Sequence, residues 1–194
     1  MGKSTAGQLL AQMQVEVADT DLIAREVVEP GQPALEELQA AFGNEIMLPG
    51  GTLNRQALAR IAFADTEARH RLESILHPRI RAIWLSRVET WGTQHRDAGV
   101  VIIPLLFETK AEVYFDATIC VACSALTQAE RLRARKWSLQ QINERRQAQW
   151  PLEKKMLLSD YVVWSEGSLE VSREQLTRII SGFRRDVSER RSKL

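Results

Sequence analysis

Four residues at the start of the sequence, Gly2-Lys3-Ser4-Thr5, have the types and the order that bind phosphate. They form the second half of the motif G-x-x-x-x-G-K-[ST]. In that motif a glycine lets the backbone approach the phosphate, and N–H groups at the start of a helix point at the anion. Lys3 would reach the β- and γ-phosphates of a nucleotide, the Ser4 hydroxyl would hold Mg²⁺, and Thr5 would add a phosphate contact.

The first half of this motif does not precede Gly2 in the sequence. The motif needs a strand of about 5–6 residues and a loop before its helix. We therefore expect either that the sequence begins at an internal methionine or that a central strand has been lost. Taken alone, the four residues also allow a simpler interpretation, which is a chance Gly-Lys-Ser-Thr at a helix start.

The composition is that of an ordinary globular protein and narrows the classes of function. The 194 residues, 44% hydrophobic and 26% charged, suit one compact core and exclude a disordered chain. Lys and Arg number 26 against 25 Asp and Glu, so a globally basic nucleic-acid binder is not expected. The longest apolar run, 100–107, is too short to span a bilayer, and no signal peptide is recognisable. Two cysteines make no disulfide framework, so we expect a cytoplasmic protein.

The elements that must position these residues follow an α/β pattern. The contiguous β-branched residues 100–103 predict a strand buried on both faces, as in a parallel sheet. Further strands are predicted over 15–19, 117–122 and 161–164. Helices are predicted over 4–13, 21–28, 34–42, from 54 onward, 65–75, 78–94, 126–135, 139–148 and 174–185. Strands that alternate with helices indicate crossover connections and a parallel sheet.

Several further segments resemble dephospho-coenzyme A kinase and occur in the order found in that family. They are VADTDLIAREVVEPG at 17–31, FG at 42–43, GTLNRQAL at 51–58, LHPRIR at 76–81, PLLFE at 104–108 and QWPLEKK at 149–155. The resemblance covers roughly residues 2–167. Each segment alone is a weak signal, whereas the ordered set identifies the chain as similar to this family.

The resemblance implies an activity and an architecture. The family uses ATP, with Mg²⁺, to phosphorylate the ribose 3′-hydroxyl of dephospho-CoA, giving CoA and ADP in the last step of coenzyme A biosynthesis. It implies a P-loop kinase core with a parallel sheet flanked by helices, a helical substrate-binding insertion and a lid. We accordingly expect a core over 1–28, 98–127 and 159–186, a substrate domain over 29–97, a lid over 128–158 and a frayed basic tail over 187–194. We also expect a cytoplasmic monomer that acts on a small molecule and needs neither nucleic acid nor a membrane.

The resemblance assigns the proton-accepting step to one carboxylate. A hydroxyl must lose its proton as it attacks the γ-phosphorus, so a carboxylate must lie within hydrogen-bonding reach. Asp21 matches the base of the family, and Asp19 would shape the site or reach the metal through water. Arg25, four residues after Asp21, would share its helical face and hold substrate phosphate. Without the resemblance, a plain surface ion pair between Asp21 and Arg25 would be the favoured interpretation.

Arginines of the lid would neutralise the charge of the transferring phosphoryl group. Arg131 and Arg135 are four residues apart on one helical face, and Arg145 and Gln149 match a second pair of lid residues. In the family an aspartate follows the residue that Arg135 matches, whereas Lys136 follows it here. The alternative is a solvated basic helix.

Two other segments supply candidate substrate contacts. His77 and Arg81 belong to the LHPRIR segment, although a histidine before a proline is also typical of a helix boundary. Pro104, Leu105 and Glu108 follow the buried strand, at the end of a parallel sheet where ligands bind. Glu108 would assist metal or substrate binding, or would simply be an acid at a helix start.

The sequence departs from the family pattern near its last strand. Trp164 and Ser165 stand where an Asp-Asn pair is common and where the family binds adenine, and Met156 replaces a common arginine. Two rival functions follow from these departures and from the incomplete motif. One is another small-molecule P-loop kinase, such as a nucleoside monophosphate kinase. The other is a catalytically impaired nucleotide-binding protein.

Overall fold

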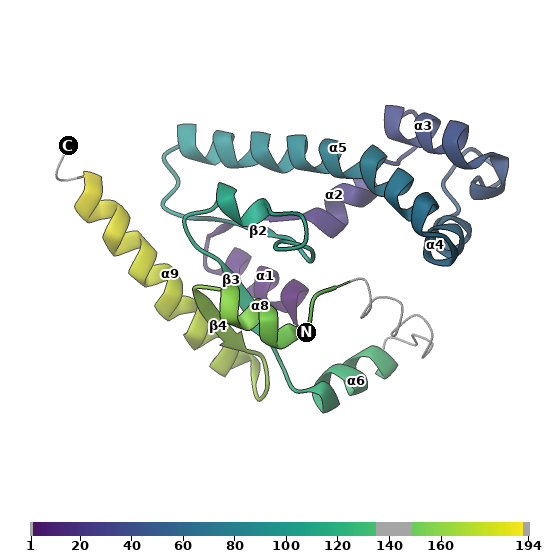
Figure 1. Cartoon of the computed structure of the whole chain (residues 1–194). Helices are drawn as coiled ribbons and strands as arrows, with labels where there is room; N and C mark the ends of the chain where they lie inside the picture. Colours follow the sequence, from purple (N-terminus) through teal and green to yellow (C-terminus); the bar gives the residue numbers. More distant parts are fainter. Residues whose placement is uncertain (1, 135–148, 192–194) are drawn as a thin grey trace. The chain divides into compact units, whose positions relative to one another are not determined.

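The computed structural model describes residues 2–134 and 149–191 (Figure 1). The chain divides into two compact units, Met1–Val17 with His95–Leu194, and Ala18–Gln94. Each unit is described by itself. The finer division into core, substrate domain and lid that the resemblance implies stays a prediction.

The first unit is built of strands and helices that alternate along the chain, which confirms the expected α/β class. Its elements are α1 (Lys3–Gln12), the beginning of β1 (Glu16–Asp19), β2 (Gly99–Ile102), the short η2 (Ala111–Tyr114), β3 (Ile119–Ala122), α6 (Ala125–Ala134), α8 (Leu152–Leu158), β4 (Tyr161–Trp164) and α9 (Leu169–Arg191). Within the described residues the strands form two sheets of two strands each, β1 with β2 and β3 with β4. Strands β3 and β4 are parallel, with Ile119 opposite Tyr161 and Ala122 opposite Trp164.

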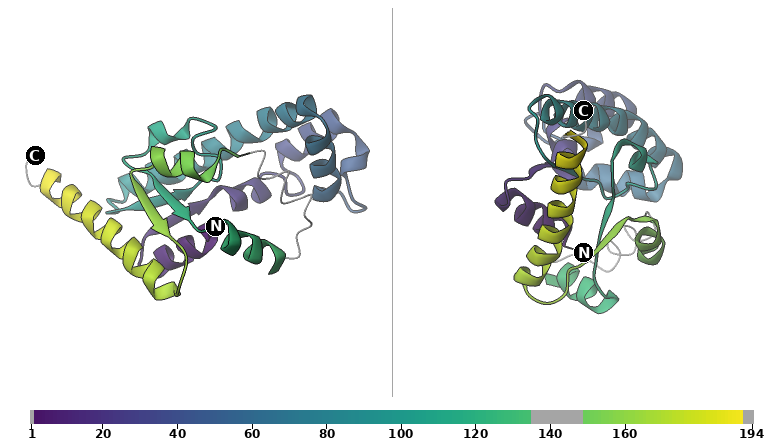
Figure 2. Two further views of the ribbon diagram at one scale, coloured as in Figure 1. Left: turned by 60° about the horizontal axis from the view of Figure 1, so that its bottom comes forward. Right: turned by 90° about the vertical axis from the view of Figure 1, so that its left-hand side faces the viewer.

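Helices α1 and α9 form the apolar core of this unit together with β4 (Figure 2). Leu9 and Leu10 of α1 are buried because their spacing places them on one helical face, as the sequence predicts. They pack in one cluster with Val163 of β4 and with Leu176 and Ile180 of α9. Burial of each such side chain contributes about 1.5–3 kcal/mol to folding. Helix α1 is thereby fixed in place, and with it the residues at its start.

The second unit consists of helices. They are α2 (Thr20–Glu26), α3 (Pro33–Phe42), the short η1 (Asn44–Ile46), α4 (Arg55–Ala64) and α5 (Thr66–Thr93), and α5 contacts α2, α3 and α4. Polar side chains fix where two of these helices begin. The Asn54 side chain accepts a hydrogen bond from the Ala57 N–H (3.1 Å), and Asp65 caps α5 by accepting from two N–H groups of its first turn. Among the described side chains of this unit, Ile23, Leu38 and Ile46 are the largest that are completely buried.

Two expectations about helix ends are wrong. The sequence predicts two helices separated near Pro78, whereas α5 is a single helix with Pro78 inside it. A proline lacks the N–H of the helical ladder, so the Ser74 carbonyl loses its helical donor, and the packing of α5 against α2, α3 and α4 holds the helix together across this turn. Helix α9 begins at Leu169 and continues to Arg191, where the sequence predicts a shorter helix and a frayed tail from residue 187. No glycine or proline interrupts the segment after Asp186, so helical propensity carries the element onward.

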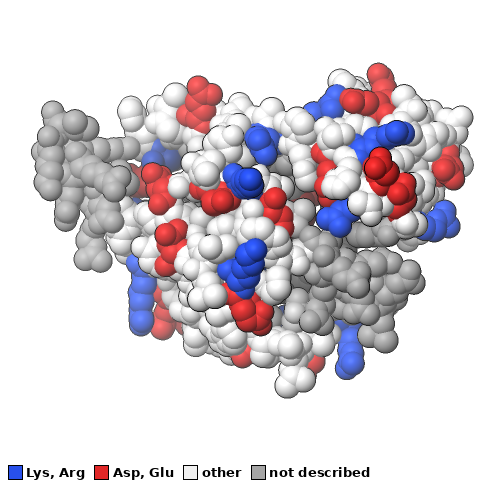
Figure 3. Space-filling model, in the orientation of Figure 1, with Lys and Arg blue, Asp and Glu red and all other residues white. Residues whose placement is uncertain are grey.

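The surface charges and the hydropathy of the described helices agree with what the composition predicts. Acidic and basic side chains are interspersed over the described part of the face shown in Figure 3. No helix in the described part of the chain combines the length and the apolar character needed to cross a bilayer.

Candidate active site

The residues that the sequence predicts to bind phosphate lie at the first turn of α1. Gly2 is the N-cap residue and has a left-handed backbone (φ 77°), which favours glycine over residues with a side chain. Among the described residues no side chain caps this helix, and its first turn contains no acidic residue. Lys3 begins the helix, Ser4 is exposed and Thr5 is half-buried. The positive end of the helix dipole therefore meets a glycine, a lysine and two hydroxyls, a combination suited to an anion.

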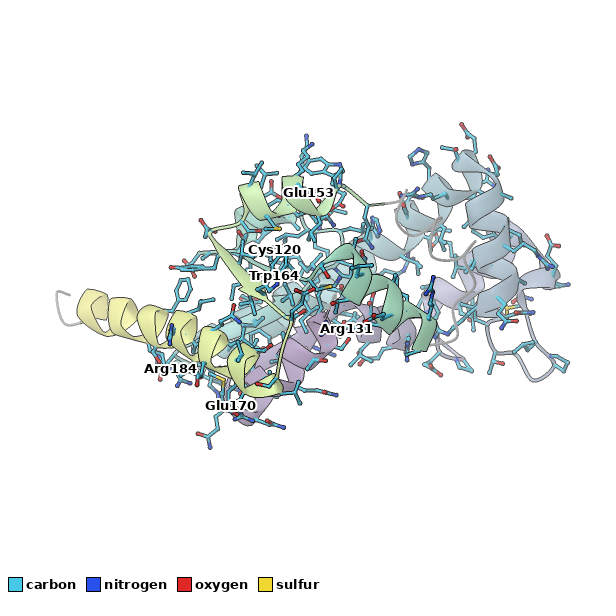
Figure 4. The ribbon with its side chains drawn as sticks, turned by 90° about the horizontal axis from the view of Figure 1, so that it is seen from below. Cys120, Arg131, Glu153, Trp164, Glu170 and Arg184 are labelled. Carbon is cyan, nitrogen blue, oxygen red and sulfur yellow. The ribbon has the colours of Figure 1, made fainter. Side chains whose placement is uncertain are left out.

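Arg131 connects helix α6 to the loop that follows β4. Its guanidinium donates to the Ser165 hydroxyl (Nη1···Oγ 3.0 Å) and to the Ser165 carbonyl (Nη2···O 2.6 Å). These bonds use two of the five N–H donors of the guanidinium. A Cβ atom at Gly2 would lie 3.1 Å from the Ser165 Oγ and 3.6 Å from the Arg131 Nη1. Gly2, Arg131 and Ser165 thus meet at one point, and Figure 4 shows Arg131 and Trp164 on the elements that bring them there.

The residue after Ser165 fixes the beginning of α6. The Glu166 carboxylate accepts hydrogen bonds from the Ser124 N–H (2.7 Å) and from the Trp164 indole N–H (2.9 Å). Hydrogen bonds from Ser124 and Thr127, and then the one from Trp164, hold the pKa of Glu166 at about 2. Ser124 in turn caps α6 by accepting from the Thr127 N–H (3.2 Å). The loop after β4 therefore holds both the first turn of α6 and its Arg131.

A cavity of about 240 Å³ opens where these residues meet. Its wall combines apolar side chains with hydroxyls and one guanidinium. The lining residues are Gly2, Thr5, Ala6, Leu9, Val121, Arg131, Leu132, Val163, Ser165, Gly167, Ser168, Leu169 and Ser172. A concave site in which polar groups converge beside apolar side chains is typical of small-molecule binding.

A buried ion pair connects the segment 104–108 to α8. The Lys155 ammonium lies 2.7 Å from the Glu108 carboxylate and donates to the Pro104 carbonyl (2.9 Å). Both side chains are nearly buried, with exposed fractions of 10% and 13%. Glu108 also accepts from the Trp150 N–H (2.8 Å), and the Leu105 carbonyl accepts from Thr109 (N···O 3.0 Å). Glu108 is thus held by bonds within the protein, so its first role is to position this segment.

The positive charges of Lys155 and Lys3 both influence the pKa of the Cys120 thiol in β3. Burial raises the pKa of Cys120, while the positive charges of Lys155 and Lys3 oppose that rise. Both ammonium groups therefore lie within electrostatic range of the same strand.

In the second unit, α2 and its N-cap residue supply the three charged residues that the resemblance singles out. Asp19 is the N-cap of α2, and its carboxylate accepts a hydrogen bond from the Asp21 N–H (2.9 Å). Asp21 lies exposed in the first turn, and Arg25 lies exposed in the last. The Arg55 guanidinium, from the GTLNRQAL segment, donates to the Arg25 carbonyl (3.4 Å). Asp19 thus supports the turn from which Asp21 projects.

His77 and Arg81 lie half-buried on α5. Burial lowers the pKa of His77, and the charge of Arg81 lowers it further, against the opposite effect of Glu73. The imidazole is therefore neutral at pH 7 and suited to hydrogen bonding rather than to charge pairing. The neighbouring Arg79 is engaged by Glu37 and by the Ile75 carbonyl. Arg81 and His77 remain the candidates for substrate contact on this helix.

The structure brings some of the predicted residues together and leaves others outside its description. Gly2 and Arg131 meet in the first unit, whereas Arg135 and Arg145 lie outside the described residues. Gln149 lies half-buried at the start of the segment that leads to Lys155. Sequence reasoning missed Lys155 and the bonding role of Ser165. Lys155 was visible as part of QWPLEKK, but nothing in the sequence shows its pairing with Glu108.

Comparison with known proteins identifies the family. A profile of the family described as dephospho-CoA kinase matches residues 1–170. A dephospho-CoA kinase of Moorella thermoacetica is 39% identical over 190 residues, which are 97% of this chain and 90% of that protein. One of Bacillus thuringiensis is 37% identical over 180 residues, 92% of this chain and 90% of that protein.

Solved structures agree in fold. The Thermus thermophilus protein TT1252 matches with a TM-score of 0.80 and 31% identity, over 93% of this chain and 91% of that one. The fold of a dephospho-CoA kinase from Campylobacter jejuni matches with a TM-score of 0.69 at 24% identity, over 95% and 92% of the two chains. These matches favour this family over other small-molecule P-loop kinases. The chain belongs to the dephospho-CoA kinase family, whose members use ATP to phosphorylate the ribose 3′-hydroxyl of dephospho-CoA in coenzyme A biosynthesis.

Proposed function

We propose that the first unit binds ATP with its phosphates at the start of α1 and its base in the cavity beside Arg131 and Ser165. The observation that carries this proposal is the meeting of Gly2, Arg131 and Ser165 at one cavity. The phosphate-binding turn, the lid helix and the loop after the last strand thereby contribute to one site. In the family that loop binds adenine. Here Ser165 would contribute by accepting the hydrogen bonds that hold Arg131 beside the cavity.

Lys3 would contact the β- and γ-phosphates, and Gly2, Ser4 and Thr5 would contribute backbone N–H groups or hydroxyls. Mg²⁺ fits this site with few protein ligands. The described residues contain no group of three or more His, Cys, Asp or Glu that could hold a metal, whereas the Ser4 hydroxyl is exposed. Mg²⁺ commonly keeps one or two protein ligands and takes the rest from phosphates and water. When bound, the ion would neutralise charge on the β- and γ-phosphates.

Asp21 would accept the proton of the ribose 3′-hydroxyl as its oxygen bonds to the γ-phosphorus. The bond from the γ-phosphorus to the bridging oxygen breaks, and ADP leaves with that oxygen. Asp19 would hold Asp21 in position through the cap of α2. Arg25, His77 and Arg81 would contact the phosphates and the body of dephospho-CoA.

The lid residues would stabilise the charge that spreads over the transferring phosphoryl group. Arg131 would give its remaining N–H donors to this task, together with Arg135, Arg145 and Gln149. Pro104, Leu105 and Glu108 would line the substrate side, with Glu108 fixed by Lys155.

We infer also that the enzyme works as a cytoplasmic monomer without nucleic acid or membrane. The net charge of +1 and the interspersed charges of Figure 3 support the part of this proposal that concerns nucleic acid, because a polyanion would favour a strongly basic surface.

Asp21→Asn tests the assignment of the base. We expect this change to lower the rate of ADP formation from ATP and dephospho-CoA by about 10²–10⁴-fold, because the hydroxyl loses its proton acceptor. The affinity for ATP, measured by calorimetry, should stay unchanged. Glu29→Gln, which removes an exposed carboxylate just after α2, is the matched control and should keep full activity. Full activity of Asp21→Asn would contradict the assignment.

A further inference from the structure

Gln175, on the second turn of α9, bonds to both backbone groups of Trp164. Its side-chain amide accepts from the Trp164 N–H (Oε1···N 2.9 Å) and donates to the Trp164 carbonyl (Nε2···O 3.0 Å). The same amide nitrogen donates to the Val171 carbonyl (3.2 Å), which ties it to its own helix. One side chain is therefore held by three bonds between α9 and the last residue of β4.

These bonds lie at the edge of β4 that faces away from β3. The next N–H along the chain, that of Ser165, donates to the Ala122 carbonyl at the end of β3 (2.7 Å). Backbone groups of successive strand residues point to opposite edges, so those of Trp164 point away from β3. In the described part of the chain β4 has no second strand neighbour. The Gln175 amide therefore takes the place of such a neighbour at Trp164.

The peptide group between Trp164 and Ser165 connects this edge to the candidate site. The Trp164 carbonyl and the Ser165 N–H belong to one rigid plane. Gln175 holds its carbonyl side, and the Ala122 carbonyl of β3 holds its N–H side. The plane leads directly to Ser165, whose hydroxyl and carbonyl accept the two bonds from the Arg131 guanidinium (3.0 and 2.6 Å). A side chain on α9 thus fixes the residue to which Arg131 is bonded.

Protection of a sheet edge is a simpler role for Gln175, because it satisfies backbone groups that would otherwise be open to pairing. That role alone predicts a change in stability and no particular effect on Arg131. The path through one peptide plane predicts more. Residues of one hydrogen-bond network affect each other non-additively, so changes at Gln175 and Arg131 should be coupled.

We propose that Gln175 is a positioning residue, which fixes the Arg131 guanidinium beside the cavity through the peptide group between Trp164 and Ser165. Gln175 is not among the residues that line the cavity, so it acts through Arg131 and not by contact with a ligand. Its effect on ATP rests on the proposed placement of the nucleotide beside Arg131, whereas its effect on the guanidinium does not.

Gln175→Met tests the proposal on the full chain, because methionine has a similar length and cannot form the bonds to Trp164. NMR of the arginine guanidinium groups is the direct measurement. We expect rotation of the Arg131 Nη groups to become about tenfold faster or more, because the bonds to Ser165 lose their alignment. A residue that only protects the sheet edge would leave these signals unchanged, and that result would overturn the proposal.

Gln175→Glu separates the two bonds to Trp164 and keeps the length of the side chain. An ionised carboxylate still accepts from the Trp164 N–H but cannot donate to the carbonyl, which is the side that holds the peptide plane. We expect this variant to release the Arg131 guanidinium as Gln175→Met does. Urea titration checks that each variant is folded, and Gln175→Glu takes the place of Gln175→Met if the latter is unfolded. Arg131 signals as in the parent protein would again overturn the proposal.

Calorimetric titration with ATP measures the coupling. The dissociation constant should rise about 3–10-fold in Gln175→Met and about tenfold or more in Arg131→Met, since a charge-assisted contact is misplaced in the first and lost in the second. The double variant should bind ATP no more weakly than Arg131→Met alone. Glu174→Met, at a neighbouring side chain that is 60% exposed, is the matched control and should bind ATP as the parent protein does.

The results distinguish this proposal from the proposed function. Additive losses in the double variant, or an equal loss in Glu174→Met, would overturn the positioning role of Gln175. Release of the guanidinium with unchanged ATP affinity in both Gln175→Met and Arg131→Met would confirm that Gln175 fixes Arg131, and would refute the placement of ATP beside it.

Discussion

The two units hold their candidate functional residues in different ways. In the first unit these residues lie on strand ends and loops that are connected by polar bonds across long stretches of sequence, such as Arg131 with Ser165. In the second unit they lie on the surfaces of helices. Its ion pairs are half-exposed, as in Arg87 with Glu26, whose side chains are 39% and 54% exposed. A change that breaks these long-range bonds in the first unit should therefore alter both stability and chemistry, whereas a change on a helix surface of the second unit should separate the two.

The ion pairs make this difference measurable. Removal of one partner of a buried pair leaves an uncompensated charge and costs about 3–5 kcal/mol. An exposed pair contributes about 0–1 kcal/mol. Lys155 with Glu108 belongs to the first kind, and Arg87 with Glu26 belongs to the second.

Lys155→Met should give the largest loss of stability. We expect the free energy of unfolding of the first unit to fall by about 3–5 kcal/mol, because Glu108 is left charged and nearly buried. Urea titration measures this loss, with Arg87→Met as the matched change in the second unit and an expected loss below about 1 kcal/mol. The double variant Glu108→Gln with Lys155→Met should lose less than Lys155→Met alone. Equal losses for Lys155→Met and Arg87→Met would remove the distinction between the units.

Lys3→Met should affect binding more than stability. We expect the dissociation constant for ATP to rise by about 10–100-fold, because a charge-assisted contact to phosphate is lost. Calorimetric titration measures the change. Arg178→Met removes a cation that is 83% exposed on α9 and serves as control. ATP binding that weakens equally in both variants would indicate a general effect of net charge rather than a site at α1.

Glu166→Gln should have the smallest effect, visible only in acid. Because the folded pKa of Glu166 is about 2 and its ordinary value is 4.5, its carboxylate adds stability that is complete above about pH 4.5 and is lost as the pH falls toward 2. The variant should lack this part of the acid dependence. Thermal unfolding at a series of pH values between 2 and 6 compares the two slopes. Parallel slopes would show that Glu166 does not hold the start of α6.

The sequence predicts the local elements well where short-range patterns decide them. The helix over 34–42 and the strand over 161–164 agree closely with α3 and β4, because apolar periodicity and β-branched residues mark them. The helix through Pro78 could not be predicted, because a proline normally ends or kinks a helix, whereas packing against α2, α3 and α4 holds α5 together. Likewise, the separation of β2 from β3 into two sheets depends on which strands pair, and a single sequence does not encode this locally.

The same distinction between short-range patterns and long-range contacts applies to the candidate site. Gly2, Lys3 and Ser4 are recognisable because their motif is contiguous. Two other contacts join residues that are far apart in the sequence, and only the folded structure shows them. They are the ion pair of Lys155 with Glu108 and the hydrogen bond from Arg131 to Ser165. The sequence marks Ser165 as a departure from the family, and the structure gives that position a bonding role.

NMR mapping of ATP on the full chain tests the central claim most directly. We expect titration with ATP and Mg²⁺ to shift the backbone amides of Gly2, Thr5, Ser165 and Gly167, which surround the cavity with Arg131. The amides of Asp21 and Arg25 should respond to dephospho-CoA instead. Shifts on ATP addition that are confined to other residues, with Gly2, Thr5 and Ser165 unchanged, would contradict the placement of the nucleotide in the first unit.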